Sequence, residues 1–137
     1  MNSPQPEILY GLFCEFVRVE KSGQVSPVGI WGESCLLETK APGTFPQLTF
    51  YSLIRNHGHL SYKAKLRVTL PGRPTPIELE ISAKGDPLQL SQNLIFNLMG
   101  VPISESGDVV ALLQLDTGPP LEREFRLHVD FRPQVTP

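Results

Sequence analysis

The chain has 137 residues, with 12 Lys and Arg against 14 Asp and Glu, which gives a formal net charge of -2 at pH 7. A chain of this length is expected to form one domain and to bury roughly 68 to 70% of its unfolded surface. Because the charges nearly balance, nothing attracts the chain to phosphate backbones or acidic lipids in general. We therefore predict neither a nucleic-acid partner nor a membrane partner.

Residues 1–7 contain no Lys or Arg, and the apolar stretch after them is interrupted by Glu15 and Arg18. This pattern is not that of a secretory signal peptide, and no apolar run reaches the ~20 residues of a membrane-spanning helix. The two cysteines, Cys14 and Cys35, are too few for a disulfide scaffold and are expected to be free thiols. We expect a reducing cytoplasm, with a bridge between the two cysteines as an alternative if their strands adjoin.

Alternation of apolar and polar residues with a period of two predicts strands along most of the chain. The first four expected strands cover residues 9–20, 25–31, 35–39 and 48–55. Gly23 supplies the positive φ that a tight turn between the first two strands needs.

The two faces of the first strand carry different residues. Leu12, Cys14 and Phe16 share one face, which we expect to point into the core. Glu15 lies between apolar neighbours on the other face, so its carboxylate needs a partner. We predict a semi-buried ion pair with Arg18, or with an Arg of a neighbouring strand, that fixes the strand register. A ligand-binding carboxylate is the alternative.

Residues 40–46 contain two Pro and one Gly and are expected to interrupt the strand pattern. Aromatic residues gather around this connection, and rigid rings give a large contact area at low entropic cost. The candidate partner-binding residues are therefore Trp31, Phe45 and Tyr51. The alternative for Phe45 is that its ring closes the open end of the fold.

His57 and His59 are separated by one Gly, a spacing that metal ligation can use because it places two imidazoles on one side of an extended chain. His128 is the only other histidine, and no zinc motif accompanies the pair. A solvated turn set by Asn56 and Gly58 is the interpretation that we prefer. A small metal-dependent hydrolase that uses His57 and His59 is the alternative.

Residues 60–70 show the clearest alternation, and the pattern resumes after a Pro- and Gly-rich loop in a strand that contains Glu78 and Glu80. The two strands are expected to pair antiparallel. Lys65 and Arg67 would then face the two glutamates, and each cross-strand ion pair would contribute roughly 0.2–1 kcal/mol.

Residues 94–101 are apolar enough for a strand that is buried on both faces or covered at an edge, with a short helix as the alternative. Residues 109–116 and the final strand, which ends before Pro133, are expected to form a second hairpin. Alternation in the final strand places Val129 inside and His128 on the polar face.

Residues 13–20 have the sequence Phe-Cys-Glu-Phe-Val-Arg-Val-Glu, and Gly23, Gly29 and Gly32 follow. This strand, Gly turn and Gly-x-x-Gly strand resemble the opening of a family of small bacterial and phage proteins of unknown function, which look like a single β-sandwich domain. The Leu-Pro-Gly turn at residues 70–72 is also similar. The resemblance implies a β-sandwich and a bacterial or phage setting, and it implies no activity.

About nine strands, turn signals every ~8 to 12 residues and the lack of a helical stripe predict an all-β fold, a single-domain antiparallel β-sandwich of about seven to nine strands. We expect the sandwich to span residues 8–133, with flexible tails at residues 1–7 and 134–137.

The expected function is a non-catalytic interaction module that recognises a protein partner or a copy of itself through an edge strand or end loops. The sequence identifies no catalytic residue, metal site, cofactor or small-molecule ligand. A phage or defence-associated structural component is a further alternative, which the resemblance suggests.

Overall fold

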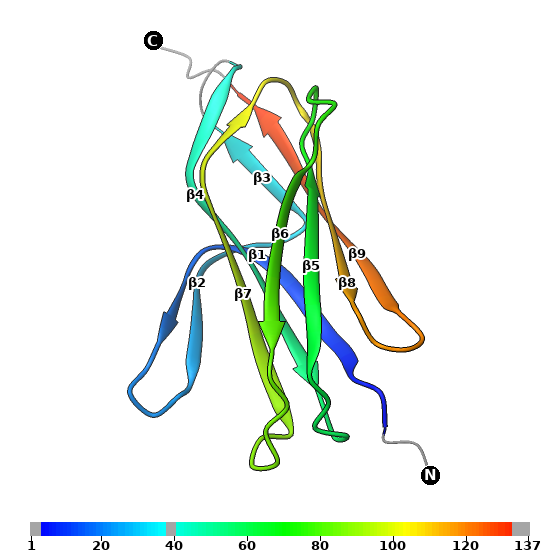
Figure 1. The fold of residues 1–137 in the computed structure, drawn as a ribbon. Coiled ribbons are helices and arrows are strands. Elements are labelled where there is room, and N and C mark those ends of the chain that lie inside the picture. The colour runs from blue at the N-terminus through cyan, green and yellow to red at the C-terminus, as the bar shows by residue number, and fades with distance from the viewer. Residues whose placement is uncertain (1–3, 38–40, 133–137) are drawn as a thin grey trace.

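Residues 4–37 and 41–132 are described by the structure, a computed structural model, and they form nine strands and no helix. The strands build two facing sheets, one of four strands in the order β2-β1-β4-β7 and one of five in the order β3-β9-β8-β5-β6 (Figure 1). The predicted all-β sandwich is confirmed, and its strand pairs are antiparallel except that of β3 with β9, which is parallel. The strands are β1 (Glu7–Val19), β2 (Val25–Trp31), β3 (Ser34–Leu37), β4 (Gly43–Arg55), β5 (Tyr62–Thr69), β6 (Ile77–Ala83), β7 (Ser91–Ile103), β8 (Gly107–Leu115) and β9 (Leu121–Phe131).

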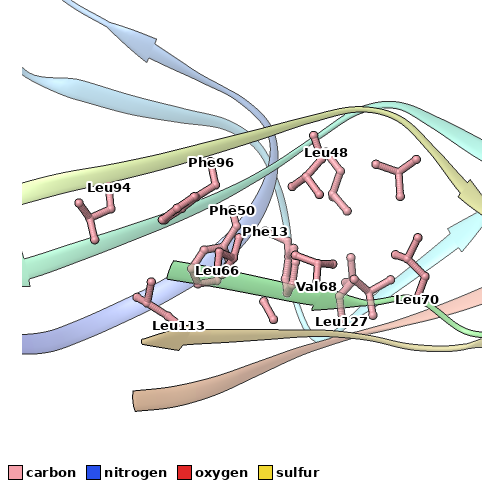
Figure 2. Close-up of a cluster of buried hydrophobic side chains, with 14 of the residues drawn as sticks. Phe13, Leu48, Phe50, Leu66, Val68, Leu70, Leu94, Phe96, Leu113 and Leu127 are labelled. Atoms are coloured by element: carbon pink, nitrogen blue, oxygen red, sulfur yellow. The ribbon is translucent and has the colours of Figure 1, made fainter. Parts of the chain in front are cut away.

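The core lies between the two sheets, and the period of two explains its composition. Every second residue of β5 is buried, among them Leu66 and Val68. Figure 2 shows these side chains between the two sheets, in the same buried cluster as Phe50 of β4. The Phe50 ring centroid lies 5.4 Å from that of Phe13 and 5.2 Å from that of Phe125, so one aromatic ring links β1, β4 and β9.

The predicted pairing of β5 with β6 is confirmed. Lys65 lies opposite Glu80 and Arg67 lies opposite Glu78 in an antiparallel register. Arg67 Nη2 is 2.8 Å from Glu78 Oε1, and Lys63 Nζ is 3.7 Å from Glu80 Oε1. These side chains are largely exposed, so each pair adds only about 0.2–1 kcal/mol and acts mainly on register.

The orientation of β1 differs from the prediction. Phe13 faces the core, where its ring meets Phe50. Cys14 is fully buried but lies outside the main core cluster, opposite Thr49 of β4. Phe16, two residues further along the same face, is 40% exposed. Because β1 carries apolar residues on both faces, alternation alone does not decide which face turns inward.

The connection expected over residues 40–46 is shorter than predicted. β4 begins at Gly43, and Gly43 and Phe45 pair with Ile103 and Val101 at the end of β7. Pairing along β7 therefore overrides the local turn signals of the Gly and Pro residues. The strand predicted over residues 35–39 is β3, whose last residue is Leu37, and the remainder of that prediction lies outside the described residues.

β7 is an edge strand that pairs with β4 alone. It is not buried on both faces, because Leu94, Phe96 and Leu98 are buried whereas Asn97 and Met99 between and after them are exposed. The strand prediction for this segment is confirmed. Of the two placements that the sequence left open, burial on both faces is wrong, and β7 lies at an edge.

β1 changes partners midway along its length. It pairs with β4 up to Cys14, opposite Thr49, and with β2 from Phe13 to Val19. Beyond Cys14, β1 and β2 pair only with each other and extend away from the two sheets as a hairpin, at the left of Figure 1. We call residues 15–29 the hairpin arm.

At its start, β1 is held to the end of β4. Glu7 lies opposite Arg55, and its carboxylate is 3.7 Å from the Arg55 guanidinium.

None of the described residues belongs to a helix that is long and apolar enough to cross a membrane.

Candidate interaction surface

Edge strands often carry features that discourage pairing with another strand. Within the described residues, β3 is a short edge strand of four residues, Ser34–Leu37. β2 contains Pro27, which has no N–H to donate, and Gly29, whose φ of 66° interrupts the extended backbone. β6 carries the two charged residues Glu78 and Glu80.

The fourth edge strand, β7, lacks such features over most of its length. Residues 91–99 contain no charged residue and no Pro. Only the far end carries the breakers Gly100, with a φ of 60°, and Pro102. An uncharged, regular edge of this length is a template for the addition of another strand.

The hydrogen-bond register shows which backbone groups of β7 are available. The N–H of Asn56 donates to the carbonyl of Leu90 at 2.7 Å. Asn56 and Leu90 come directly after and before the opposed residues Arg55 and Ser91, so they form a hydrogen-bonded pair in the register of β4 and β7. In an antiparallel pair, such hydrogen-bonded positions recur at every second residue. The even-numbered residues of β7 therefore bond to β4, and the N–H and C=O groups of Asn93 and Ile95 point away from it.

A groove lies beside the first half of β7, and we call it the edge groove. It has a volume of about 790 Å³ and is lined by residues of β6, β7, the loop between them and the hairpin arm. None of the described residues that line it is charged. Several are exposed apolar side chains, namely Val19 (64% exposed), Leu88 (91%) and Leu90 (56%).

The loop between β6 and β7 is held in place by Asp86. Asp86 Oδ1 accepts a hydrogen bond from the N–H of Leu88 at 2.9 Å, and the Asp86 carbonyl accepts one from the N–H of Gln89 at 3.0 Å. This is the turn in which a side chain replaces a backbone acceptor. Leu88 is thus presented to solvent by an ordered turn.

A second hollow, the fork pocket, lies where β1 parts from β4. Its volume is about 420 Å³, and its walls come from β1, β2, Leu37 of β3 and the first half of β4. Glu15 is the only charged residue among the described residues that line it. The aromatic residues that line it are Phe16, Trp31 and Phe45.

The three candidate partner-binding residues occupy two different places. Trp31 is partly buried and meets Phe45 edge to face, with ring centroids 5.9 Å apart. Phe45 is only 3% exposed, as expected for a ring that closes one end of the fold. Tyr51 is also 3% exposed and lies away from this pair, where its hydroxyl donates to Asn93. Burial raises the pKa of Tyr51 to about 12.

The indole N–H of Trp31 is buried and has no acceptor among the described residues. A buried donor without a partner costs about 1–3 kcal/mol. Packing, including the contact with Phe45, therefore holds this ring in place.

Glu15 and Arg18 do not form the ion pair that we predicted. Arg18 Nε lies 3.1 Å from Glu20 Oε1, so Arg18 pairs with a neighbour on its own face of the strand. The Glu15 side chain is exposed and lies over Gly29, where a Cβ atom would come within 2.6 Å of Glu15 Cδ. The absence of a side chain at Gly29 thus leaves the room that the Glu15 carboxylate occupies.

The histidines are placed apart from both hollows. His57 lies in the turn between β4 and β5, which Asn56 sets by exchanging side-chain hydrogen bonds with the backbone of Leu60. His59 Nδ1 lies 2.8 Å from the carbonyl of Asp86. Within residues 4–37 and 41–132, no three His, Cys, Asp or Glu side chains are placed to hold a metal ion.

Both cysteines are buried free thiols. Burial raises the pKa of Cys14 and of Cys35, so both are protonated at neutral pH. A protonated, buried thiol is a poor nucleophile.

Neither the edge groove nor the fork pocket was predicted from the sequence. One signal was present: the stretch from residue 91 to 99 has no charge, and Leu88 and Leu90 stand in the loop before it. The hairpin arm, which forms the other wall, gave no such signal, because its divergence from β4 follows from long-range pairing. No protein-family model and no curated protein matches the chain.

Proposed function

We propose that the chain is a non-catalytic interaction module that binds an extended, uncharged segment of a partner protein as an added strand along β7. The observation that carries this proposal is the edge groove. It combines a free, uncharged strand edge with exposed apolar side chains that nothing else in the described residues covers. Main-chain hydrogen bonds would supply affinity, and the apolar walls would select the side chains.

The alternation of the added strand matches the groove. An added strand would bond to the outward N–H and C=O groups of Asn93 and Ile95. Its side chains would point alternately to the two sides of the sheet, as those of β7 do. On one side they would meet apolar residues such as Leu90, and on the other the valines of the hairpin arm. Charged side chains have no partner there, so we expect an uncharged apolar segment.

The hairpin arm favours a single extended segment over a second copy of the whole domain. Val19, Gly23 and Val25 line the groove on the side away from β7. A single strand fits between two such walls, whereas the edge of a second sheet brings its neighbouring strands with it. A second copy is therefore the alternative occupant that the experiment must distinguish.

The experiment selects binders from a displayed library of random peptides of roughly nine residues, a length that matches the uncharged part of β7. We expect peptides that alternate apolar and uncharged polar residues. Ile95→Pro removes one outward N–H, and Pro is tolerated on a strand edge. It should abolish binding, whereas Ile95→Val, which keeps the N–H, should retain it.

Two outcomes would contradict strand addition: no selected peptide binds, or Ile95→Pro binds every selected peptide as well as the unchanged chain does. The oligomeric state of both proteins is measured alongside. A dimer that Ile95→Pro converts to a monomer would identify a second copy as the occupant of the same edge.

We also infer that the protein works in a reducing compartment, the cytoplasm. The two buried free thiols support this, since oxidising compartments favour paired cysteines.

A further inference from the structure

The fork pocket has features that the proposed function does not use. It lies where β1 leaves β4, whereas the edge groove lies along the first half of β7, and the two share no lining residue. Its volume of about 420 Å³ is within the range of small-ligand sites. Its chemistry therefore calls for a separate explanation.

Three aromatic residues line the pocket, Phe16, Trp31 and Phe45. Trp31 is held against Phe45, with ring centroids 5.9 Å apart, and Phe16 is 40% exposed. The face of an aromatic ring carries negative potential and attracts cations, most strongly when the ring is that of Trp. Trp31 and Phe45 come from different strands, and their mutual packing holds the wall before any ligand arrives.

Among the described residues that line the pocket, Glu15 alone is charged, and its charge is negative. Its carboxylate is exposed, has no ion pair within the described residues and lies over the bare backbone of Gly29. A single carboxylate beside aromatic rings suits a positively charged organic group, because the ring faces and the carboxylate attract the same charge.

We propose that the fork pocket binds an organic cation, an alkylammonium or guanidinium group, between its aromatic wall and the carboxylate of Glu15. The cation comes either from a small free molecule or from a Lys or Arg side chain of a protein. The recognition chemistry is the same for both sources, and the experiment separates them.

Trp31 is the only tryptophan of the chain, so its fluorescence reports on this pocket alone. The probes are choline, N-acetyl-lysine methylamide and N-acetyl-arginine methylamide. Each is compared with a neutral molecule of similar shape, 3,3-dimethylbutan-1-ol for choline and N-acetyl-norleucine methylamide for the others. We expect a saturable change with a charged probe and none with its neutral counterpart. Tighter binding of choline indicates a free cation, and tighter binding of an amino-acid derivative indicates a protein side chain.

The variants test the two parts of the site. Glu15→Gln should weaken binding of the charged probe by about tenfold, the loss of roughly 1.4 kcal/mol of charge-assisted contact. Glu33→Gln makes the same change of net charge at an exposed residue outside the pocket and should leave binding unchanged. Phe16→Leu keeps an apolar side chain without the ring, and it should also weaken binding of the cation.

The proposal is overturned if no charged probe gives a saturable change. Equal binding of a charged probe and its neutral counterpart would also overturn it, since the pocket would then be merely apolar. So would unchanged affinity in Glu15→Gln. Because Glu15 is exposed, this variant is expected to fold, and an unchanged Trp31 emission spectrum without ligand checks that it does.

Discussion

Gly11 lies on β1 at the point where two aromatic rings cover the strand. A Cβ atom there would come within 2.6 Å of Phe50 Cζ and 2.8 Å of Phe125 Cζ. Those rings also contact each other, with centroids 5.2 Å apart, so neither moves freely. The glycine therefore allows β1 to pass beneath the aromatic part of the core.

We predict that Gly11→Ala lowers the free energy of unfolding by about 1–3 kcal/mol, the usual cost of overpacking. Urea unfolding of the purified protein measures this difference. Gly32→Ala is the matched control, because nothing lies within 4 Å of a Cβ atom at that position. Equal losses in the two variants would show that the rings above Gly11 adjust without cost.

Asp108 is the centre of a cluster of charged groups on the outer face of β8 and β9. Asp108 Oδ1 lies 2.9 Å from His128 Nδ1, and Oδ2 lies 3.3 Å from Arg126 Nη1. The hydrogen bond with His128, and secondly that with Arg126, lower the pKa of Asp108 from its usual 3.8. The ionised form is thus favoured in the folded state.

A lowered pKa in the folded state stabilises the fold at pH values above the unfolded pKa, and the contribution is lost as the pH falls through the folded value. We predict that Asp108→Asn is less stable than the unchanged protein at neutral pH. The difference should shrink as the pH falls below 3.8. Urea unfolding as a function of pH measures it. A difference that persists or grows in acid would contradict the assignment.

The edge strands differ in whether they carry features that discourage their exposed backbone groups from pairing with another strand. Pro27 in β2 and the glutamates of β6 discourage pairing at two edges, and the described part of β3 is only four residues long. β7 has no such feature over residues 91–99. Since exposed edges promote aggregation, an edge without protection is expected to have a use.

We predict an alternating pattern of amide hydrogen exchange along β7. The amides of Leu94 and Phe96 bond to β4 and should exchange slowly, whereas those of Asn93, Ile95 and Asn97 point outward and should exchange at least about tenfold faster. NMR after transfer into deuterated water measures each amide. Uniform protection along β7 in a dilute monomer would show that the outward groups are already paired.

Element boundaries were predicted best where pairing is local. β5 and β6 form a hairpin, and its register was predicted correctly, with Lys65 opposite Glu80 and Arg67 opposite Glu78. The predicted ion pair of Arg67 with Glu78 is confirmed, whereas Glu80 pairs with Lys63 rather than with Lys65. β4 and β7 pair across a much longer stretch of chain, from Gly43 opposite Ile103 to Arg55 opposite Ser91. Their extra length came from this pairing, which local turn signals do not report.

The molecule divides into a packed sandwich and a hairpin arm with few supports. Phe50 is fully buried and surrounded by the rings of Phe13, Phe96 and Phe125. Val19 in the arm is 64% exposed. A two-stranded ribbon is marginally stable by itself, so the arm depends on its attachment to the sandwich.

We predict that Phe50→Ala lowers the free energy of unfolding by about 3–5 kcal/mol, whereas Val19→Ala changes it by less than about 0.5 kcal/mol. Chemical denaturation followed by circular dichroism measures both. If Val19→Ala proved as destabilising as Phe50→Ala, the arm would be an integral part of the cooperative unit.

Alternation of apolar and polar residues was enough to predict an all-β sandwich, most of its strands and the face of β5 and β9 that turns inward. It succeeded there because one face of each strand is polar, so water selects the orientation. It did not decide the inward face of β1, whose two faces are both apolar. The free edge of β7, the groove beside it and the pocket containing Glu15 and Trp31 depend on strand order. Strand order is set by pairing between distant segments, and a local pattern carries no information about it.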